Sequence, residues 1–213
     1  MNAPVFPGKL KKNDAFFIYG ALQKKPFVYV YQQSDLEIVL GPSCSAEKET
    51  VVDQCLIDGV SVVERRGGGG TVLLAPGMVI TIIVGKRTPT QNALEIFDKI
   101  HVQMIRILNE LGVCGVEKKG ISDLAVNNKK ILGSSLYMGK NPDLYYYQSS
   151  LMVQPEIELL SRYLAHPPRE PDYRNGRNHK EFCTTLRNEG FSVTVSEICD
   201  VFSCKMPKYI QDF

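Results

Sequence analysis

Four consecutive glycines, Gly67 to Gly70, follow an arginine pair at the end of an apolar run. Glycine has no Cβ, so its backbone can adopt positive φ and let a ligand approach the N–H groups closely. Arg65 and Arg66 place two cations beside this loop, and guanidinium groups bind phosphates and carboxylates. The segment therefore predicts an anion-binding loop. A flexible hairpin or bulge between two strands is the competing interpretation.

The glycine run differs from the common nucleotide-binding signatures. The sequence contains no G-x-x-x-x-G-K-[ST] motif. A second apolar run, from Thr71 to Val84, follows the glycines where a Rossmann turn needs a helix. A nucleotide bound here would lie on a loop between two strands, which is a different class of site.

A second group of reactive side chains surrounds the dipeptide Asn127-Asn128. Asparagine tolerates left-handed φ, so a tight hairpin is expected here, and it would bring Asp123 close to Lys130. An aspartate can hold a magnesium ion or a ligand hydroxyl, and a lysine can neutralise a phosphate or stabilise charge on an acyl carbonyl. The alternative is an ordinary exposed hairpin with solvated Lys129 and Lys130.

Together the two segments resemble the lipoate-protein ligase family, within the wider group of biotin ligases, lipoate ligases and octanoyl transferases. The family's loop runs Arg-Arg-x-Ser-Gly-Gly-Gly-Ala-Val, and residues 64–72 run Glu-Arg-Arg-Gly-Gly-Gly-Gly-Thr-Val. The family's hairpin is Asn-Asp-Leu followed by Gly-Lys-Lys-Ile-Ser-Gly-Ser-Ala. It is similar to Ser-Asp-Leu at 122–124 and Asn-Lys-Lys-Ile-Leu-Gly-Ser-Ser at 128–135. The closing Val-Thr-Ser-Leu resembles Cys-Thr-Thr-Leu at 183–186.

The resemblance implies an ATP-dependent reaction in two steps. Lipoate or octanoate attacks ATP to give an acyl-adenylate, and a lysine of a lipoyl-carrier domain then takes the acyl group. By position, Lys130 would bridge the carboxyl and phosphate oxygens, and Asp123 would serve Mg²⁺ or the adenylate. The other residues that would bind the acyl group and the adenylate are Arg65, Gly68, Gly69, Gly70, Thr71, Gly133 and Ser134.

Two further segments could complete such a site. The apolar stretches 73–74 and 78–82 could wall a slot for the acyl chain, although each is also a good core strand. The proline- and arginine-rich segment 167–177 is a candidate lid. Its Arg169, Arg174 and Arg177 could reach a triphosphate or an acidic patch on the carrier domain. The alternative for this segment is a solvated surface loop.

The chain also departs from the family pattern. The family's His-Asp after the glycines corresponds to Leu74-Ala75, and its loop serine corresponds to Gly67. Its hairpin asparagine corresponds to Ser122, and a later His-Gly falls near Gln148-Ser149. These differences leave two alternatives to a ligase. One is a cysteine acyltransferase, for which Cys114 and Cys183 are the nearest candidates, and the other is a non-catalytic module that binds an acyl group or a lipoyl domain.

Composition narrows the remaining classes. The formal net charge of +2 gives no argument for nucleic acid or a membrane surface, and no apolar stretch approaches the ~20 residues of a membrane span. Six cysteines without C-x-x-C spacing indicate reduced thiols and a cytoplasmic protein. The three histidines form no zinc pattern. The absence of tryptophan argues against a biotin ligase.

The pattern of elements predicts an α+β fold with a mixed, largely antiparallel sheet flanked by helices, of the biotin/lipoate ligase type. We expect one catalytic domain over residues 1–213, without a separate C-terminal accessory domain, which a small subunit could supply. Helices are expected at 13–22, 45–57, 91–111, 155–164 and 196–202. Strands are expected at 27–31, 36–40, 61–65, 71–75, 78–84, 121–126, 130–137 and 144–152, with the first two paired.

Overall fold

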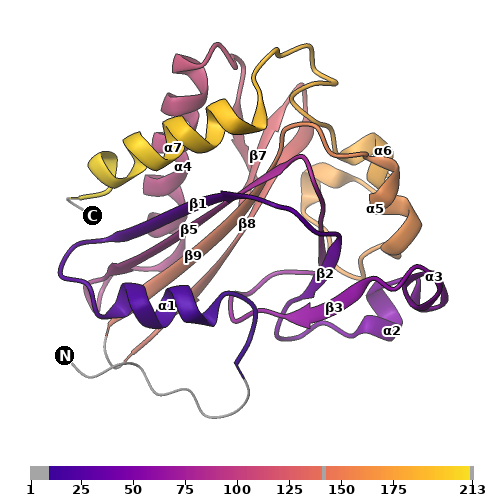
Figure 1. The fold of residues 1–213 in the computed structure, drawn as a ribbon, viewed down its shortest axis with the longest axis horizontal. Helices are drawn as coiled ribbons and strands as arrows, with labels where there is room; N and C mark the ends of the chain where they lie inside the picture. Colours follow the sequence, from indigo (N-terminus) through magenta and orange to yellow (C-terminus); the bar gives the residue numbers. More distant parts are fainter. Residues whose placement is uncertain (1–9, 141–142, 212–213) are drawn as a thin grey trace.

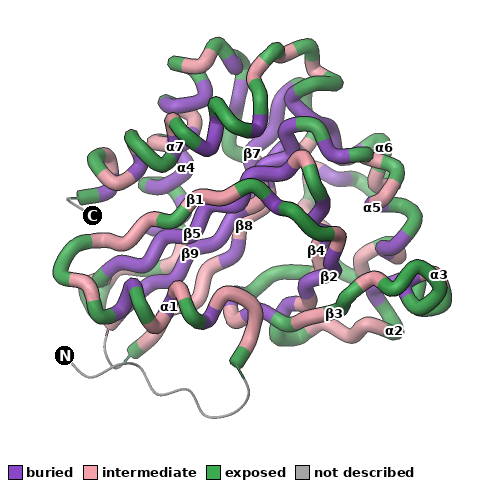
Figure 2. Tube along the Cα trace, in the orientation of Figure 1, coloured by how far each residue is buried: buried purple, intermediate pink, exposed green. Residues whose placement is uncertain are grey.

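The computed structural model describes residues 10–140 and 143–211. Its centre is a six-stranded antiparallel sheet (Figure 1). In spatial order the strands are β1 (Phe27–Gln32), β5 (Met78–Lys86), β9 (Leu144–Met152), β8 (Lys129–Met138), β7 (Asp123–Val126) and β6 (Glu117–Lys119). Figure 2 shows buried residues concentrated along the middle strands, and almost every residue of β5 and β9 is buried. The prediction of an α+β fold with a largely antiparallel sheet is confirmed.

A smaller sheet lies beside the main one, with the order β3 (Ser61–Glu64), β2 (Glu37–Leu40) and β4 (Val72–Leu74). The predicted pairing of strands 27–31 and 36–40 is wrong, because β1 pairs with β5 and β2 pairs with β3 and β4. The connection contains a buried glutamine, Gln33, whose side chain donates to Asp35 O and to Glu37 Oε1, both at 2.8 Å. These bonds turn the chain away from β1 and into the second sheet.

Helices cover both faces of the main sheet. On one face lie α4 (Ala93–Glu110) and α7 (Val195–Tyr209), and on the other lies α1 (Asp14–Ala21) (Figure 1). A capping box between Asn92 and Glu95 starts α4, and an apolar stripe packs it on the sheet. Leu94 belongs to the expected stripe but is 55% exposed, at the second residue of the helix.

Shorter elements complete the fold. They are α2 (Ala46–Glu49), α3 (Val52–Ile57), α5 (Glu158–Tyr163), the 3₁₀ turn η1 (Asp172–Arg174) and α6 (His179–Phe182). The single helix predicted at 45–57 is divided at Thr50, which forms a β-bridge to Leu164. The final helix, expected at 196–202, extends to Tyr209. The sequence reasoning missed β6 and α6.

The Asn127-Asn128 turn forms as predicted, with φ values of 51° and 59°. All six cysteines are free, in agreement with the expected reduced thiols. Within residues 10–140 and 143–211, no helix combines the length and apolar character needed to cross a membrane.

Candidate active site

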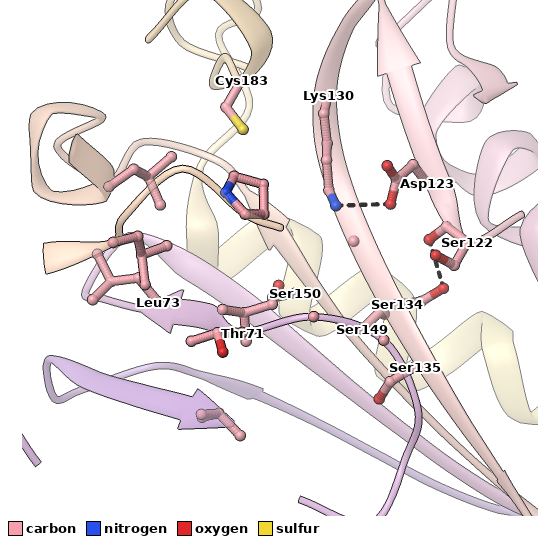
Figure 3. A pocket seen from close by; sticks show the side chains of 18 of the residues that line it. Thr71, Leu73, Ser122, Asp123, Lys130, Ser134, Ser135, Ser149, Ser150 and Cys183 are labelled. Carbon is pink, nitrogen blue, oxygen red and sulfur yellow. Dashed lines mark hydrogen bonds and ion pairs between the residues drawn. The ribbon is translucent and has the colours of Figure 1, made fainter. Parts of the chain in front are cut away.

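A cavity of about 780 Å³ opens between the main sheet, the small sheet and the segment that follows α5. At one end Asp123 and Lys130, on the two strands of the β7–β8 hairpin, form an ion pair with 2.8 Å between Lys130 Nζ and Asp123 Oδ1 (Figure 3). A β-bulge after Leu124 places Lys130 opposite Ala125. Asp123 and Ala125 lie two residues apart, so their side chains share one face of the sheet. The bulge therefore puts both charged side chains on the cavity face.

Gly133 makes room for the lysine side chain. A Cβ at this position would lie 2.8 Å from both Cε and Nζ of Lys130, which is closer than real Cβ contacts allow. Gly133 is also the strand partner of Asp123. Because this position has no side chain, Lys130 can lie across it and reach the carboxylate.

The other oxygen of Asp123 accepts a hydrogen bond from the Tyr173 hydroxyl at 2.8 Å. Tyr173 lies in η1, inside the segment that was predicted to be a lid. Burial, and secondarily the nearby carboxylate, raise the pKa of Tyr173 above its ordinary value. The sequence reasoning missed this residue, and the signal that could have found it is an aromatic side chain in an otherwise polar loop.

The glycine loop forms the cavity wall opposite the hairpin, but its arginines do not point freely into the space. Arg65 is buried and donates from Nη1 to Val39 O at 3.1 Å. Its Nη2 donates to Gly68 O at 3.1 Å and to Gly70 O at 2.7 Å. Nε of Arg65 is buried and has no hydrogen-bond partner among the described residues.

Arg66 turns away from the cavity. It forms a bidentate ion pair with the buried Asp14 of α1, at 2.7 and 2.9 Å. The prediction that both arginines beside the glycines offer a cation to a ligand is therefore wrong for Arg66. This arginine anchors the loop to α1, and only Arg65 lines the cavity.

The loop rests directly on β8. Gly68 N donates to Leu136 O at 3.1 Å, and a Cβ at Gly67 would lie 2.6 Å from Ser135 Oγ. Gly69 has a φ of 99°, which favours glycine. Gly69 and Gly70 line the cavity, whereas Gly68 is not among the described lining residues. Gly68 is thus placed to hold the loop against the sheet.

Thr71, at the end of the loop, donates from its backbone N–H and its hydroxyl to Glu49 Oε2, at 3.1 and 2.7 Å. Glu49 is buried and also lines the cavity. Burial opposes its ionisation, but hydrogen bonds from Thr71 and Cys44 lower its pKa. Glu49 was missed because its partner is 22 residues away in the sequence, and a glutamate in a short polar helix carries no local signal.

Ser134 lines the cavity, and its hydroxyl is hydrogen-bonded within the protein. It donates to Ser122 O at 2.7 Å (Figure 3), and His101 Nε2 lies 3.1 Å from the same oxygen. Since the serine proton goes to Ser122, the imidazole must donate its own Nε2 proton. Burial lowers the pKa of His101 to about 4, which keeps this side chain neutral. His101, which the sequence reasoning missed, therefore holds Ser134 on β8, one of the two strands of the hairpin.

The other end of the cavity is apolar. Its lining includes side chains from both sheets and from α5, among them Leu73, Leu74, Met78, Ile80, Met152 and Leu160. The first four belong to the two stretches expected to wall an acyl slot, and Ile82 of the second stretch is buried in the core instead. The cavity thus has a charged end and an apolar end.

The three arginines of the predicted lid differ in placement. Arg169 is exposed and lines the cavity. Arg174 also lines it but is buried, with its guanidinium 4.8 Å above the Phe182 ring. Arg177 is not among the described lining residues, and its Nη2 donates to Tyr173 O and Asn128 O. Arg177 therefore fastens the loop to the hairpin.

The candidate cysteine nucleophiles are poorly placed for thioester chemistry. Cys183 lines the cavity near Lys130 (Figure 3), but burial raises its pKa to about 11. A thiol must be deprotonated to act as a nucleophile, so this environment works against it. Cys114 is exposed, and it is not among the described residues that line the cavity.

Comparison with known proteins decides the family. The model of the lipoyl protein ligase A/B catalytic domain matches residues 17–206. This chain belongs to that family. It is 29% identical over 139 residues to "Probable lipoate-protein ligase A" of Mycoplasma genitalium, covering 64% of this chain and 39% of that protein. It is 23% identical over 177 residues to a lipoate–protein ligase of Streptococcus pyogenes, covering 81% of this chain and 50% of that protein. The chain therefore spans half or less of these curated ligases.

Solved structures of ligases share the fold. One comes from work on a bi-partite lipoate protein ligase and its E2 lipoyl domain from Thermoplasma acidophilum. It matches with a TM-score of 0.77 and 17% identity, and the match covers 92% of this chain and 76% of that one. Another is a lipoate-protein ligase A bound with ATP, with a TM-score of 0.74 and 19% identity, covering 92% of this chain and 77% of that one. The predicted lipoate ligase type of fold is confirmed.

Proposed function

We propose that this family member is an ATP-dependent lipoate–protein ligase that activates lipoate or octanoate as the acyl-adenylate and passes it to a lysine of a lipoyl-carrier domain. The observation that carries the proposal is one cavity with an ion-paired lysine at its charged end and an apolar wall at its other end. A medium-chain fatty acid has the same two ends. Membership of the ligase family supports the same reaction.

In the first step, a carboxylate oxygen of the acid attacks the α-phosphorus of ATP, and the bond to the pyrophosphate oxygen breaks. Negative charge then gathers on the carboxyl and phosphate oxygens. Lys130 supplies a positive charge and N–H donors, and Asp123 holds its ammonium group in place. Donors fixed in advance on developing charge are among the strongest catalytic devices.

In the second step, the amine of the carrier lysine attacks the acyl carbonyl, AMP leaves with the bonding electrons, and the amine loses a proton. Arg65, Gly69, Gly70 and Thr71 would bound the ligand on the loop side, and Gly133 and Ser134 would bound it on the sheet side. Arg169 and Arg174, which line the cavity in the segment after α5, would meet the phosphate groups.

Magnesium enters this proposal through the nucleotide. Within the described residues, no three His, Cys, Asp or Glu side chains gather into a metal-binding group. Mg²⁺ in nucleotide sites is held by one or two carboxylates together with the phosphates. Asp123 would be the single protein ligand here, and it would share its oxygens with Lys130 and Tyr173. When bound, the ion would neutralise phosphate charge.

Lipoate-dependent exchange of radioactive pyrophosphate into ATP tests the first step. Wild-type protein should catalyse exchange, and Lys130→Ala should lower the rate by about 10²–10³-fold, because it removes the charge that stabilises the transition state. Lys129→Ala is the matched control, since Lys129 is the exposed neighbour of Lys130 on the same hairpin and should be dispensable. Exchange that survives in Lys130→Ala would refute the assigned role.

The thioester alternative has its own test. Transfer from an acyl carrier without ATP, lost in Cys183→Ser or Cys114→Ser, would favour it over the ligase. A non-catalytic binding module would yield no acyl-adenylate when the protein, ATP and lipoate are mixed and analysed by mass spectrometry. Both alternatives predict no pyrophosphate exchange.

The acceptor and any accessory subunit belong to the proposal as well. One related structure comes from work on a two-part ligase, and the curated relatives are at least twice as long as the part this chain matches. A separate polypeptide could supply the remainder here. The single-domain organisation over residues 1–213 and the cytoplasmic location stay predictions.

A further inference from the structure

We infer that Tyr173 is a positioning residue for the proposed reaction and that its hydroxyl sets the orientation of Asp123, which in turn holds Lys130. This inference rests on the proposed function, because it concerns the same lysine. It assigns a role to a residue on a separate loop, 43 residues beyond Lys130 in the sequence.

The carboxylate of Asp123 has two partners on its two oxygens. Lys130 Nζ lies 2.8 Å from Oδ1, and the Tyr173 hydroxyl donates to Oδ2 at 2.8 Å. The terminal torsion of an aspartate side chain is soft, so a carboxylate bonded on one oxygen alone can rotate. The tyrosine removes that freedom and keeps Oδ1 facing the ammonium group.

The loop that carries Tyr173 is attached to the hairpin at a second point. Arg177 Nη2 donates to Tyr173 O at 2.8 Å and to Asn128 O, at the hairpin turn, at 3.1 Å. The hydroxyl of Tyr173 thus reaches the base of the hairpin, and Arg177 reaches its tip. With two attachments on one hairpin, the position of the phenol is set relative to Lys130.

Packing holds the tyrosine ring in the same place. The ring centroid lies 5.0 Å from that of Phe182. The chain at Gly120 also passes close to the ring, since a Cβ built there would lie 3.8 Å from Tyr173 Cε1. The ring is therefore placed by contacts that do not involve its hydroxyl, so removal of the hydroxyl alone leaves these contacts intact.

Tyr173→Phe isolates the hydroxyl. We expect kcat for pyrophosphate exchange to fall about tenfold, as for the loss of one hydrogen bond to a charged group, with KM for ATP and lipoate within about twofold. Tyr137→Phe is the matched control, because Tyr137 lies on β8 beyond the cavity lining and packs edge-on against Phe17. It should keep the wild-type rate. A wild-type kcat in Tyr173→Phe would overturn the inference.

A second measurement needs no activity. A double-mutant cycle in urea unfolding compares Tyr173→Phe, Asp123→Ala and the double variant. Because the Tyr173 hydroxyl donates directly to the Asp123 carboxylate, the double variant should lose less stability than the sum of the two single losses. Additive losses would overturn the inference.

The two proposals can fail separately. If wild-type protein lacks exchange activity, the proposed function fails, while the double-mutant cycle still decides whether Tyr173 and Asp123 are coupled. If wild-type exchange is normal, Tyr173→Phe keeps the wild-type kcat and the cycle shows additive losses, the role of Tyr173 fails alone.

Discussion

The glycine loop and the β7–β8 hairpin line the same cavity, but they use positive charge in opposite ways. In the loop, Arg65 donates three hydrogen bonds to backbone carbonyls and Arg66 is paired with buried Asp14. In the hairpin, Lys130 is held by one side chain, Asp123. A ligand anion can share the lysine without disturbing the backbone, whereas it cannot take over the arginine bonds without opening the loop.

The difference teaches that a count of cations beside a glycine run does not give the charge available to a ligand. Arg65 closes the loop on itself and keeps the glycine backbone in one conformation. Such preorganisation lowers the entropy cost of binding without a large contribution of charge. The loop then supplies shape, and the hairpin supplies the electrostatics.

The largest expected effect comes from breaking the loop. Arg65→Met keeps the buried stem but removes the bonds to Val39, Gly68 and Gly70. We expect the free energy of unfolding to fall by about 3 kcal/mol, since bonds to charged groups contribute ~1.5–3 kcal/mol each and part of the loop is exposed. Urea unfolding measures this loss.

Arg169→Met is the matched control, because Arg169 is an exposed arginine on the same cavity. Its substitution should change the free energy of unfolding by no more than about 0.5 kcal/mol. If Arg65→Met were as stable as wild type but lost ligand binding, the loop arginine would be a free ligand for anions. The contrast with the hairpin would then be wrong.

The sequence predicted the parts of this site that depend on local pattern. The periodicity of α4, the Asn127-Asn128 turn and the approach of Asp123 to Lys130 follow from spacing alone. The inward turn of Arg65 and the pairing of Arg66 could not be predicted, because their partners are set by tertiary packing. The same holds for Tyr173, whose partner is 50 residues away.

The β1–β2 error has a similar cause. Two strand-like segments four residues apart favour a hairpin when only local pattern is considered. The side-chain bonds of buried Gln33 and the pairing of β1 with the distant β5 override that preference. Residues whose role depends on long-range contacts are thus the ones that sequence reasoning missed.

A smaller effect distinguishes glycines in the two regions. A Cβ at Gly133 would lie 2.8 Å from Lys130 Nζ, whereas a Cβ at Gly68 would meet nothing within 4 Å. Gly133→Ala should displace the lysine and lower pyrophosphate exchange about tenfold, with little loss of stability, because the flexible end of Lys130 can move. Gly68→Ala should keep nearly full exchange. Equal losses of exchange activity in both variants would show that the glycine loop tolerates an added methyl group no better than the hairpin does.

The loop and the hairpin meet at Gly67 and Ser135. The family pattern has serine where Gly67 stands and alanine where Ser135 stands, so this chain carries the hydroxyl on the strand instead of the loop. A Cβ at Gly67 would lie 2.6 Å from Ser135 Oγ and 2.9 Å from its Cβ. The two positions share one space, so we expect the two differences from the family to compensate for each other.

This exchange leads to the smallest and most specific prediction. Gly67→Ser alone should lower exchange several-fold, because the new side chain pushes the loop from β8. Adding Ser135→Ala removes the nearest clashing atom, so the double variant should recover part of that loss. A double-mutant cycle measures the coupling, which for residues in contact is ~0.5–3 kcal/mol. If the two effects add without coupling, Gly67 and Ser135 do not compete for space. The shape of the loop would then be independent of the strand that carries Lys130.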